Sequence, residues 1–247
     1  MTDFTIPIVA ATFLAAGIVK GVTGMGLPTL AMGILGALLS PLAAASLLII
    51  PSMTTNLWQL LAGPNIGVLM RRLWPMMVAS MAGTLIAMPM LTGGDSRLTT
   101  SALGAALIAY ALYTLFARPF RVSSGQERWL SPLIGLVTGL IAGGTGVFVL
   151  PAVPWLHALG LEKDDLVQAL GMSFTTSTIA LAFGLASRQA WQVDQLALSM
   201  LAVIPALIGM WAGQMLRRAV SPATFRRWFL IMLALLGGEM LLRAAGT

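Results

Sequence analysis

Charged residues are scarce in this sequence. Only 9% of the 247 residues are Asp, Glu, Lys or Arg, whereas a soluble globular domain carries about 25%. Hydrophobic residues make up 58% of the chain, and few residues remain for a separate domain outside a membrane. This balance excludes an ordinary soluble protein and predicts a single integral membrane domain.

Cysteine is absent and histidine occurs once, which removes several kinds of chemistry. Without cysteine there are no disulfides, thiolate metal sites or thiol redox reactions. No H-E-x-x-H motif is present, and "GMSFT" at 171–175 lacks the second glycine of a serine nucleophile elbow. We therefore expect no enzyme, no metal and no cofactor. The net charge of +6 is spread over single or paired basic residues, so no nucleic-acid partner is expected.

Apolar runs separated by polar residues predict ten helical segments. Their expected ranges are 5–19, 26–39, 42–62, 73–91, 98–117, 130–142, 146–159, 166–186, 195–215 and 224–244. Six are long enough to cross a bilayer. The first, second, sixth and seventh segments reach only about 20 Å, against a hydrocarbon core of about 30 Å. The expected fold is an all-α polytopic membrane protein that contains two pairs of short, broken helices.

Basic residues gather in alternate loops. One side would hold Arg71, Arg72, Arg118, Arg121, Arg128, Lys163, Arg217, Arg218, Arg226 and Arg227. The other side would hold Arg97, Arg188 and Arg243, and Lys20 would remain within the membrane. The excess of basic residues predicts that the first side is cytoplasmic and that both termini are outside.

The two halves of the chain resemble each other. "GIVKGVTGMG" at 17–26 matches "GLVTGLIAGGTG" at 135–146 if the second copy has two extra residues, and "PSMTTNLWQLLAG" at 51–63 matches "MSFTTSTIALAFG" at 172–184 without a gap. Residues 1–120 and 121–247 are therefore predicted to be two repeats, each a short broken pair followed by three transmembrane helices. Three crossings are odd in number, so the repeats would be inverted, which is typical of secondary transporters with a site at the repeat interface.

The glycine-rich breaks and their neighbours are the candidate substrate site. Irregular backbone at membrane depth must line protein or a cavity, and helices that begin near Gly26 and Gly146 would direct positive dipole ends towards an anion. Lys20 would cost at least about 2.5–3.5 kcal/mol in the membrane, and no acidic residue is close to it in sequence. The predicted substrate-binding residues are Lys20, Thr23, Gly24, Gly26, Ser52, Thr55, Asn56, Gln59, Gly144, Thr145, Gly146, Ser173, Thr176 and Ser177.

Structural roles compete with these assignments. Gly17, Gly21, Gly135, Gly139, Gly209 and Gly213 form small-xxx-small patterns, for which close helix packing is favoured. Lys20 would extend to the interface if the first helix were shifted, and the Ser/Thr hydroxyls would bond to their own helices. Pro51 is expected to kink its helix and free a carbonyl. Glu239 and Arg243 are spaced for an i, i+4 ion pair, and His157 is expected to be incidental.

The motifs "KGVTGMGLP" and "GLIAGGTGVFVLP", each followed by a Ser/Thr-rich helix, resemble those of the TauE/SafE family of sulfite exporters. The resemblance covers nearly the whole chain. It implies transport of sulfite, organosulfonates or related small anions across the bacterial inner membrane. Together with the inverted repeats, it leads us to expect a carrier that works by alternating access. A passive anion channel, a transporter of another oxyanion or carboxylate, and an assembly subunit are the alternatives. A proton is the candidate coupling ion. No recognisable motif encodes the direction of transport or the oligomeric state.

Overall fold

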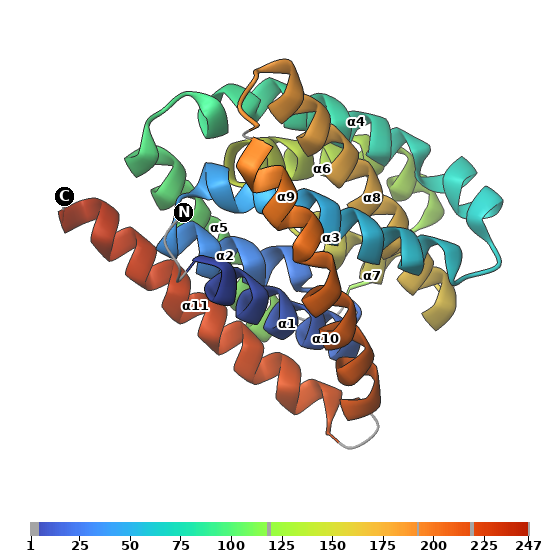
Figure 1. Cartoon of the computed structure of the whole chain (residues 1–247). Helices are drawn as coiled ribbons and strands as arrows, with labels where there is room; N and C mark the ends of the chain where they lie inside the picture. The colour runs from blue at the N-terminus through green and yellow to red at the C-terminus, as the bar shows by residue number, and fades with distance from the viewer. Residues whose placement is uncertain (1–4, 118–119, 192, 218–219, 247) are drawn as a thin grey trace.

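The computed structural model describes residues 5–117, 120–191, 193–217 and 220–246, and within these ranges it contains eleven helices and no strand. Figure 1 shows them packed into one bundle. The helices are α1 (Thr5–Thr23), α2 (Leu27–Leu38), α3 (Pro41–Leu61), α4 (Ile66–Thr92), α5 (Ser96–Phe116), α6 (Ser124–Thr145), α7 (Ala152–Ala158), α8 (Lys163–Ser187), α9 (Val193–Leu201), α10 (Val203–Leu216) and α11 (Pro222–Gly246). The predicted all-α class is confirmed.

Six helical stretches in the described part of the chain are long and apolar enough to cross a membrane. They are α1, α4, α5, α8, the combined α9–α10 stretch and α11. The predicted single segment at 195–215 is divided into α9 and α10 because Pro205 has no N–H to bond to the carbonyl of Leu201. The chain is therefore a multi-pass membrane protein by length and composition.

The prediction of four short helices is half wrong. Helix α1 has 19 residues and α6 has 22, so they extend about 29 and 33 Å. Of the four helices predicted to be short, only α2, with 12 residues, and α7, with seven, are short. The glycines of the motifs do not stop α1 and α6, because tertiary packing of a small-residue face overrides their weak helix propensity. Each broken pair is thus one long helix followed by one short helix.

The long helices pack in four principal pairs, which are α1 with α10, α4 with α6, α3 with α8, and α5 with α11. Glycines allow the backbones of all four pairs to approach closely, and the approach is tightest in α1 with α10 and in α4 with α6. A Cβ atom on Gly21 would overlap the carbonyl oxygen of Met210, and one on Gly139 would overlap that of Ser80. The same holds for Gly17, Gly135, Gly209 and Gly213, so the packing role expected for all six glycines is confirmed.

The contacts also define helix directions. Gly17 lies against Ala206 and Gly21 against Met210, so α1 and α10 run parallel. Helices α4 and α6 are parallel in the same way. In contrast, α3 and α8 are antiparallel, because Gly171 meets Leu60 while Thr178 lies beside Asn56 near the middle of α3. Helices α5 and α11 are also antiparallel: Gly33 contacts Leu107 with Leu233, and Gly36 contacts Leu103 with Met240.

Pro51 leaves one carbonyl of α3 without its usual helical partner, as predicted. That carbonyl belongs to Leu47, and the hydroxyl of Ser199 on α9 donates to it across 2.8 Å. The Ser199 hydroxyl also accepts a longer bond from the N–H of Ile50, at 3.4 Å. A polar side chain from the second half of the chain thus provides the hydrogen bond that the kinked helix of the first half lacks.

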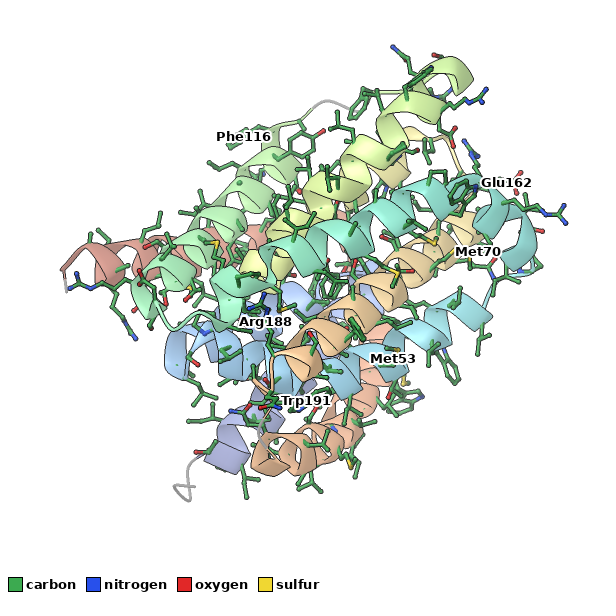
Figure 2. The ribbon with its side chains drawn as sticks, turned by 90° about the horizontal axis from the view of Figure 1, so that it is seen from above. Met53, Met70, Phe116, Glu162, Arg188 and Trp191 are labelled. Carbon is green, nitrogen blue, oxygen red and sulfur yellow. The ribbon has the colours of Figure 1, made fainter. Side chains whose placement is uncertain are left out.

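One end of the bundle collects the basic loops, and we call it the basic end. Arg72 at the start of α4 forms an ion pair with Glu127 on α6, with 2.6 Å between Nε and Oε1, and its guanidinium also reaches the carbonyl of Leu159. Figure 2 shows Met70 and Glu162 at this end, whereas Arg188 lies towards the other end of α8. Arg118 and Arg218 lie outside the described residues. Figure 1 places both chain ends on the side away from the α3–α4 and α10–α11 connections.

Candidate functional site

The first helix break extends from Gly24 to Gly26. Both glycines have positive φ angles, 78° and 105°, in the left-handed region that favours glycine. Helix α2 begins at Leu27, which confirms the helix start predicted near Gly26. The Thr23 hydroxyl lies 2.8 Å from the carbonyl of Val19 and 2.6 Å from that of Met25, and it accepts the N–H of Met25. Thr23 therefore stabilises the break itself.

The second break has a different form. Gly146, with φ of 75°, ends α6, but the next helix begins only at Ala152. The helix start predicted at Gly146 is therefore wrong. Pro151 explains the delay, because a residue that precedes proline is disfavoured in the α conformation and proline has no N–H for a helical bond. The Thr145 hydroxyl accepts the N–H of Val147 and donates to the carbonyl of Ile141, so it too is used locally.

The local geometry corrects the alignment of the two glycine motifs. Thr23 and Thr145 make the same pair of local hydrogen bonds, and each is followed by a glycine with φ near 75°. The two motifs therefore align without a gap, "GIVKGVTG" at 17–24 with "GLIAGGTG" at 139–146. In this alignment Ala142, rather than Thr138, is the counterpart of Lys20.

Lys20 lies at the centre of a buried polar cluster. Its side chain is only 2% exposed, so the alternative in which it extends to the interface is excluded. The ammonium donates to the Thr55 hydroxyl at 3.0 Å and to the side-chain carbonyl of Asn56, both on α3. A helix of the first break thus places its cation against the polar middle of the next long helix.

The cluster extends from α3 to α8. The Asn56 amide nitrogen donates to the Ser52 hydroxyl at 3.0 Å and to the Thr178 hydroxyl at 3.2 Å. The Thr178 hydroxyl in turn donates to the carbonyl of Phe174. Thr178 belongs to the Ser/Thr-rich stretch that the sequence offers as hydrogen-bonding groups for an oxyanion, although the predicted substrate-binding residues end at Ser177. Its position in the Ser/Thr-rich stretch beside Ser177 was the signal available in the sequence.

The charge of Lys20 is not neutralised by the described protein groups. Its two hydrogen-bond partners are neutral, and the ion pairs found in the described residues, Arg72–Glu127 and Arg243–Glu239, involve other cations. The latter confirms the predicted i, i+4 pair. A lysine ammonium has three N–H donors, of which two are used here. One donor therefore remains for a ligand.

Gln59 links this cluster to the first break. It lies one helical turn after Asn56 on α3, and its amide nitrogen donates to the carbonyl of Gly24 at 2.6 Å. Its amide oxygen is buried without a hydrogen-bond partner among the described residues. The predicted residues Lys20, Gly24 and Gln59 are therefore neighbours along one face of α3.

The remaining predicted residues occupy other surroundings. Ser173 and Ser177 are buried on α8, and the Ser177 hydroxyl has no partner within the described residues, whereas Thr176 is half-buried. Gly144 packs against Met90 of α4, and Gly146 packs against Met32 of α2. The second motif thus contributes to helix packing, while the first motif and the two Ser/Thr-rich helices provide the polar cluster.

The fold and this cluster define a class: a polytopic helical membrane protein with an uncompensated cation buried between its two halves. The family model described as sulfite exporter TauE/SafE matches residues 9–240. The chain therefore belongs to the TauE/SafE family of sulfite exporters, and the resemblance of its motifs is confirmed. No curated protein and no solved structure matches it. Membership of this family implies transport of sulfite or a related anion across a membrane.

Proposed function

We propose that the chain is a secondary carrier that moves sulfite or a small organosulfonate across the bacterial inner membrane by alternating access. The observation that carries the proposal is the buried ammonium of Lys20, which is surrounded by neutral hydrogen-bonding groups. An unpaired cation at membrane depth costs at least about 2.5–3.5 kcal/mol, and a bound anion offsets this cost.

The chemistry of the cluster suits an oxyanion. Lys20 supplies charge and a free donor, and the neutral groups of Ser52, Asn56 and Thr178 hydrogen-bond to one another and hold the polar surroundings of this ammonium in place. The combination of one cation with several neutral groups favours a site that binds a small oxyanion and then releases it.

The helix pairs support an inverted repeat made of residues 1–120 and 121–247. If α1 to α5 correspond to α6 to α11, with α9 and α10 counted as one helix, α3 corresponds to α8 and α5 to α11. Both of these pairs are antiparallel, as an axis in the membrane plane requires. The pair α1–α10 is then equivalent to α6–α4, and both are parallel. The Lys20 cluster, which joins α3 to α8, lies at this repeat interface.

Orientation and coupling follow from charge. The basic end of the bundle would be cytoplasmic under the positive-inside rule. An empty site carries the positive charge of Lys20, whereas a site that holds a monoanion is neutral. The loaded and empty carriers therefore respond differently to a membrane potential, and a co-transported proton is a chemically suitable way to balance them.

The test is Lys20→Met in proteoliposomes, with Lys163→Met as the matched control, since Lys163 is the second lysine in the chain and is exposed. We expect Lys20→Met to weaken binding of sulfite and methanesulfonate by about 10- to 100-fold, because a charge-assisted bond contributes roughly 1.5–3 kcal/mol. Thermal stability should be unchanged or higher, because an uncompensated buried charge is removed. Lys163→Met should behave as wild type.

Two results would contradict this function. If the Lys20→Met and wild-type proteins bind sulfite and methanesulfonate with equal affinity, the Lys20 cluster is not the substrate site. Unsaturable flux without counterflow would indicate a passive channel, the alternative that retains the same anion selectivity. The near-complete burial of Lys20 favours a carrier, because an open pore would expose it to water.

A further inference from the structure

A separate open pocket of about 260 Å³ lies at the basic end, between α5, α7 and α11. Its polar lining comes from Tyr113 and Thr114 at the end of α5, His157 on α7 and Arg226 at the start of α11. These residues are distinct from the Lys20 cluster. The pocket is large enough for a small sulfonate with water around it.

The pocket has the electrostatic character of an anion site. Arg226 makes no ion pair within the described residues, so its charge is available to a ligand. The pKa of His157 is lowered, first by burial and second by the nearby positive charge of Arg226. At neutral pH the pocket therefore combines one permanent cation with a neutral imidazole that can donate a hydrogen bond.

The pocket borders the first helix break. Met25 lines it, and Met25 lies between Gly24 and Gly26. The Tyr110 hydroxyl, 3.4 Å from the Met25 sulfur, holds this side chain from α5. The N–H of Gly24 bonds to the carbonyl of Lys20, so Lys20 lies one helical turn before Gly24, which is the residue next to Met25. Met25 thus belongs both to the lining of the open pocket and to the break that follows Lys20 in the chain.

We propose that this pocket is a second anion site, in which Arg226 and His157 hold the sulfonate headgroup of the cargo before it passes Met25 towards Lys20. The identity of the cargo rests on the proposed function, whereas the presence of an anion site does not. An anionic lipid headgroup has the same chemistry. It would be expected in the adjoining groove, which is lined by Arg226 and Arg227 together with the apolar Leu230 and Ile231. Tyr113, Thr114 and His157 add neutral hydrogen-bonding groups beside Arg226, and these groups favour a free small anion for the pocket itself.

The single histidine of the chain provides a direct test. NMR of the full-length protein with labelled histidine gives the pKa of His157 with and without methanesulfonate, which remains an anion throughout the titration. A bound anion should raise this pKa in a saturable manner in wild type, Arg226→Lys, Lys20→Met and Arg227→Gln. The effect should disappear in Arg226→Gln. In transport assays, Arg226→Gln should raise KM by about tenfold, with Arg227→Gln unchanged.

Each other result has a definite meaning. No saturable change in wild type, or the same change in Arg226→Gln, would overturn the pocket as an anion site. If Arg226→Gln and Arg227→Gln reduce transport equally, and transport also depends on anionic lipid, the two arginines would be assigned to binding a lipid headgroup instead. If the pocket binds methanesulfonate while the wild-type protein transports neither sulfite nor sulfonate, the proposed function fails and the pocket stands. If the wild-type protein transports sulfite or sulfonate and Arg226→Gln leaves KM unchanged, the pocket fails as a cargo site and the proposed function stands.

Discussion

At the scale of single residues, the polar cluster depends on one cation and its neutral partners. The sequence predicts Lys20, Ser52, Thr55 and Asn56, because polar groups are conspicuous in apolar segments and the last three lie within two turns of one helix. It does not reveal that Thr178 pairs with Asn56, since this pairing depends on how α8 is rotated against α3. Side-chain pairing between distant helices is a tertiary property that residue spacing does not determine.

Thr178→Val tests the contribution of α8 to the site. Valine has nearly the shape of threonine, so the change removes the hydroxyl that accepts from Asn56 and leaves the packing in place. We expect affinity for methanesulfonate to fall about three- to tenfold, which corresponds to roughly 0.5–1.5 kcal/mol for a neutral hydrogen bond. Binding measured by calorimetry provides the readout.

Thr175→Val is the matched control for this substitution. The Thr175 hydroxyl donates to the carbonyl of Gly171 in its own helix, at 2.7 Å, and makes no hydrogen bond to another helix within the described residues. Its replacement should leave affinity unchanged. An equal loss in both variants would mean that α8 responds to any such change and that Thr178 has no specific role.

At the scale of helices, the glycine motifs have two different functions. The sequence predicts the start of α2 and the close helix seams, because proline, left-handed glycine and small-xxx-small spacing are local signals. It predicts α1 and α6 as too short, because the glycines that weaken an isolated helix are the ones that allow these helices to pack. The delayed start of α7 depends on Pro151, whose effect outweighs the similarity of the two motifs.

Gly21→Ala tests the seam between α1 and α10. The added Cβ would overlap the backbone carbonyl of Met210, which cannot move without separating the helices. We expect the free energy of unfolding to fall by about 1–3 kcal/mol, with a decrease in Tm of about 2–4 °C for each kcal/mol. Thermal unfolding in detergent gives the measurement.

Gly238→Ala is the control for the loss of a helical glycine. No atom lies within 4 Å of its added Cβ, and it is within α11. Alanine should leave stability unchanged or raise it by up to about 1 kcal/mol. A Gly21→Ala protein as stable as Gly238→Ala would show that the seam has room to adjust.

At the scale of the whole molecule, two similar halves make an asymmetric site. Composition alone predicts a membrane domain, and the Ser/Thr-rich stretches predict that α3 and α8 are equivalent. Their antiparallel contact places both polar stretches at one interface. Only the first half contributes a cation, however, because Ala142 occupies the position that corresponds to Lys20. The glycine motif of the second half packs against Met90 and Met32.

The most direct test of the central claim is a crystal structure with selenite, which has the shape and charge of sulfite and a strong anomalous signal. Our account predicts an anomalous peak within hydrogen-bond distance of the Lys20 Nζ atom, between α3 and α8. A weaker second peak beside Arg226 would agree with the pocket at the basic end. Saturating selenite with no peak at Lys20 would contradict the account.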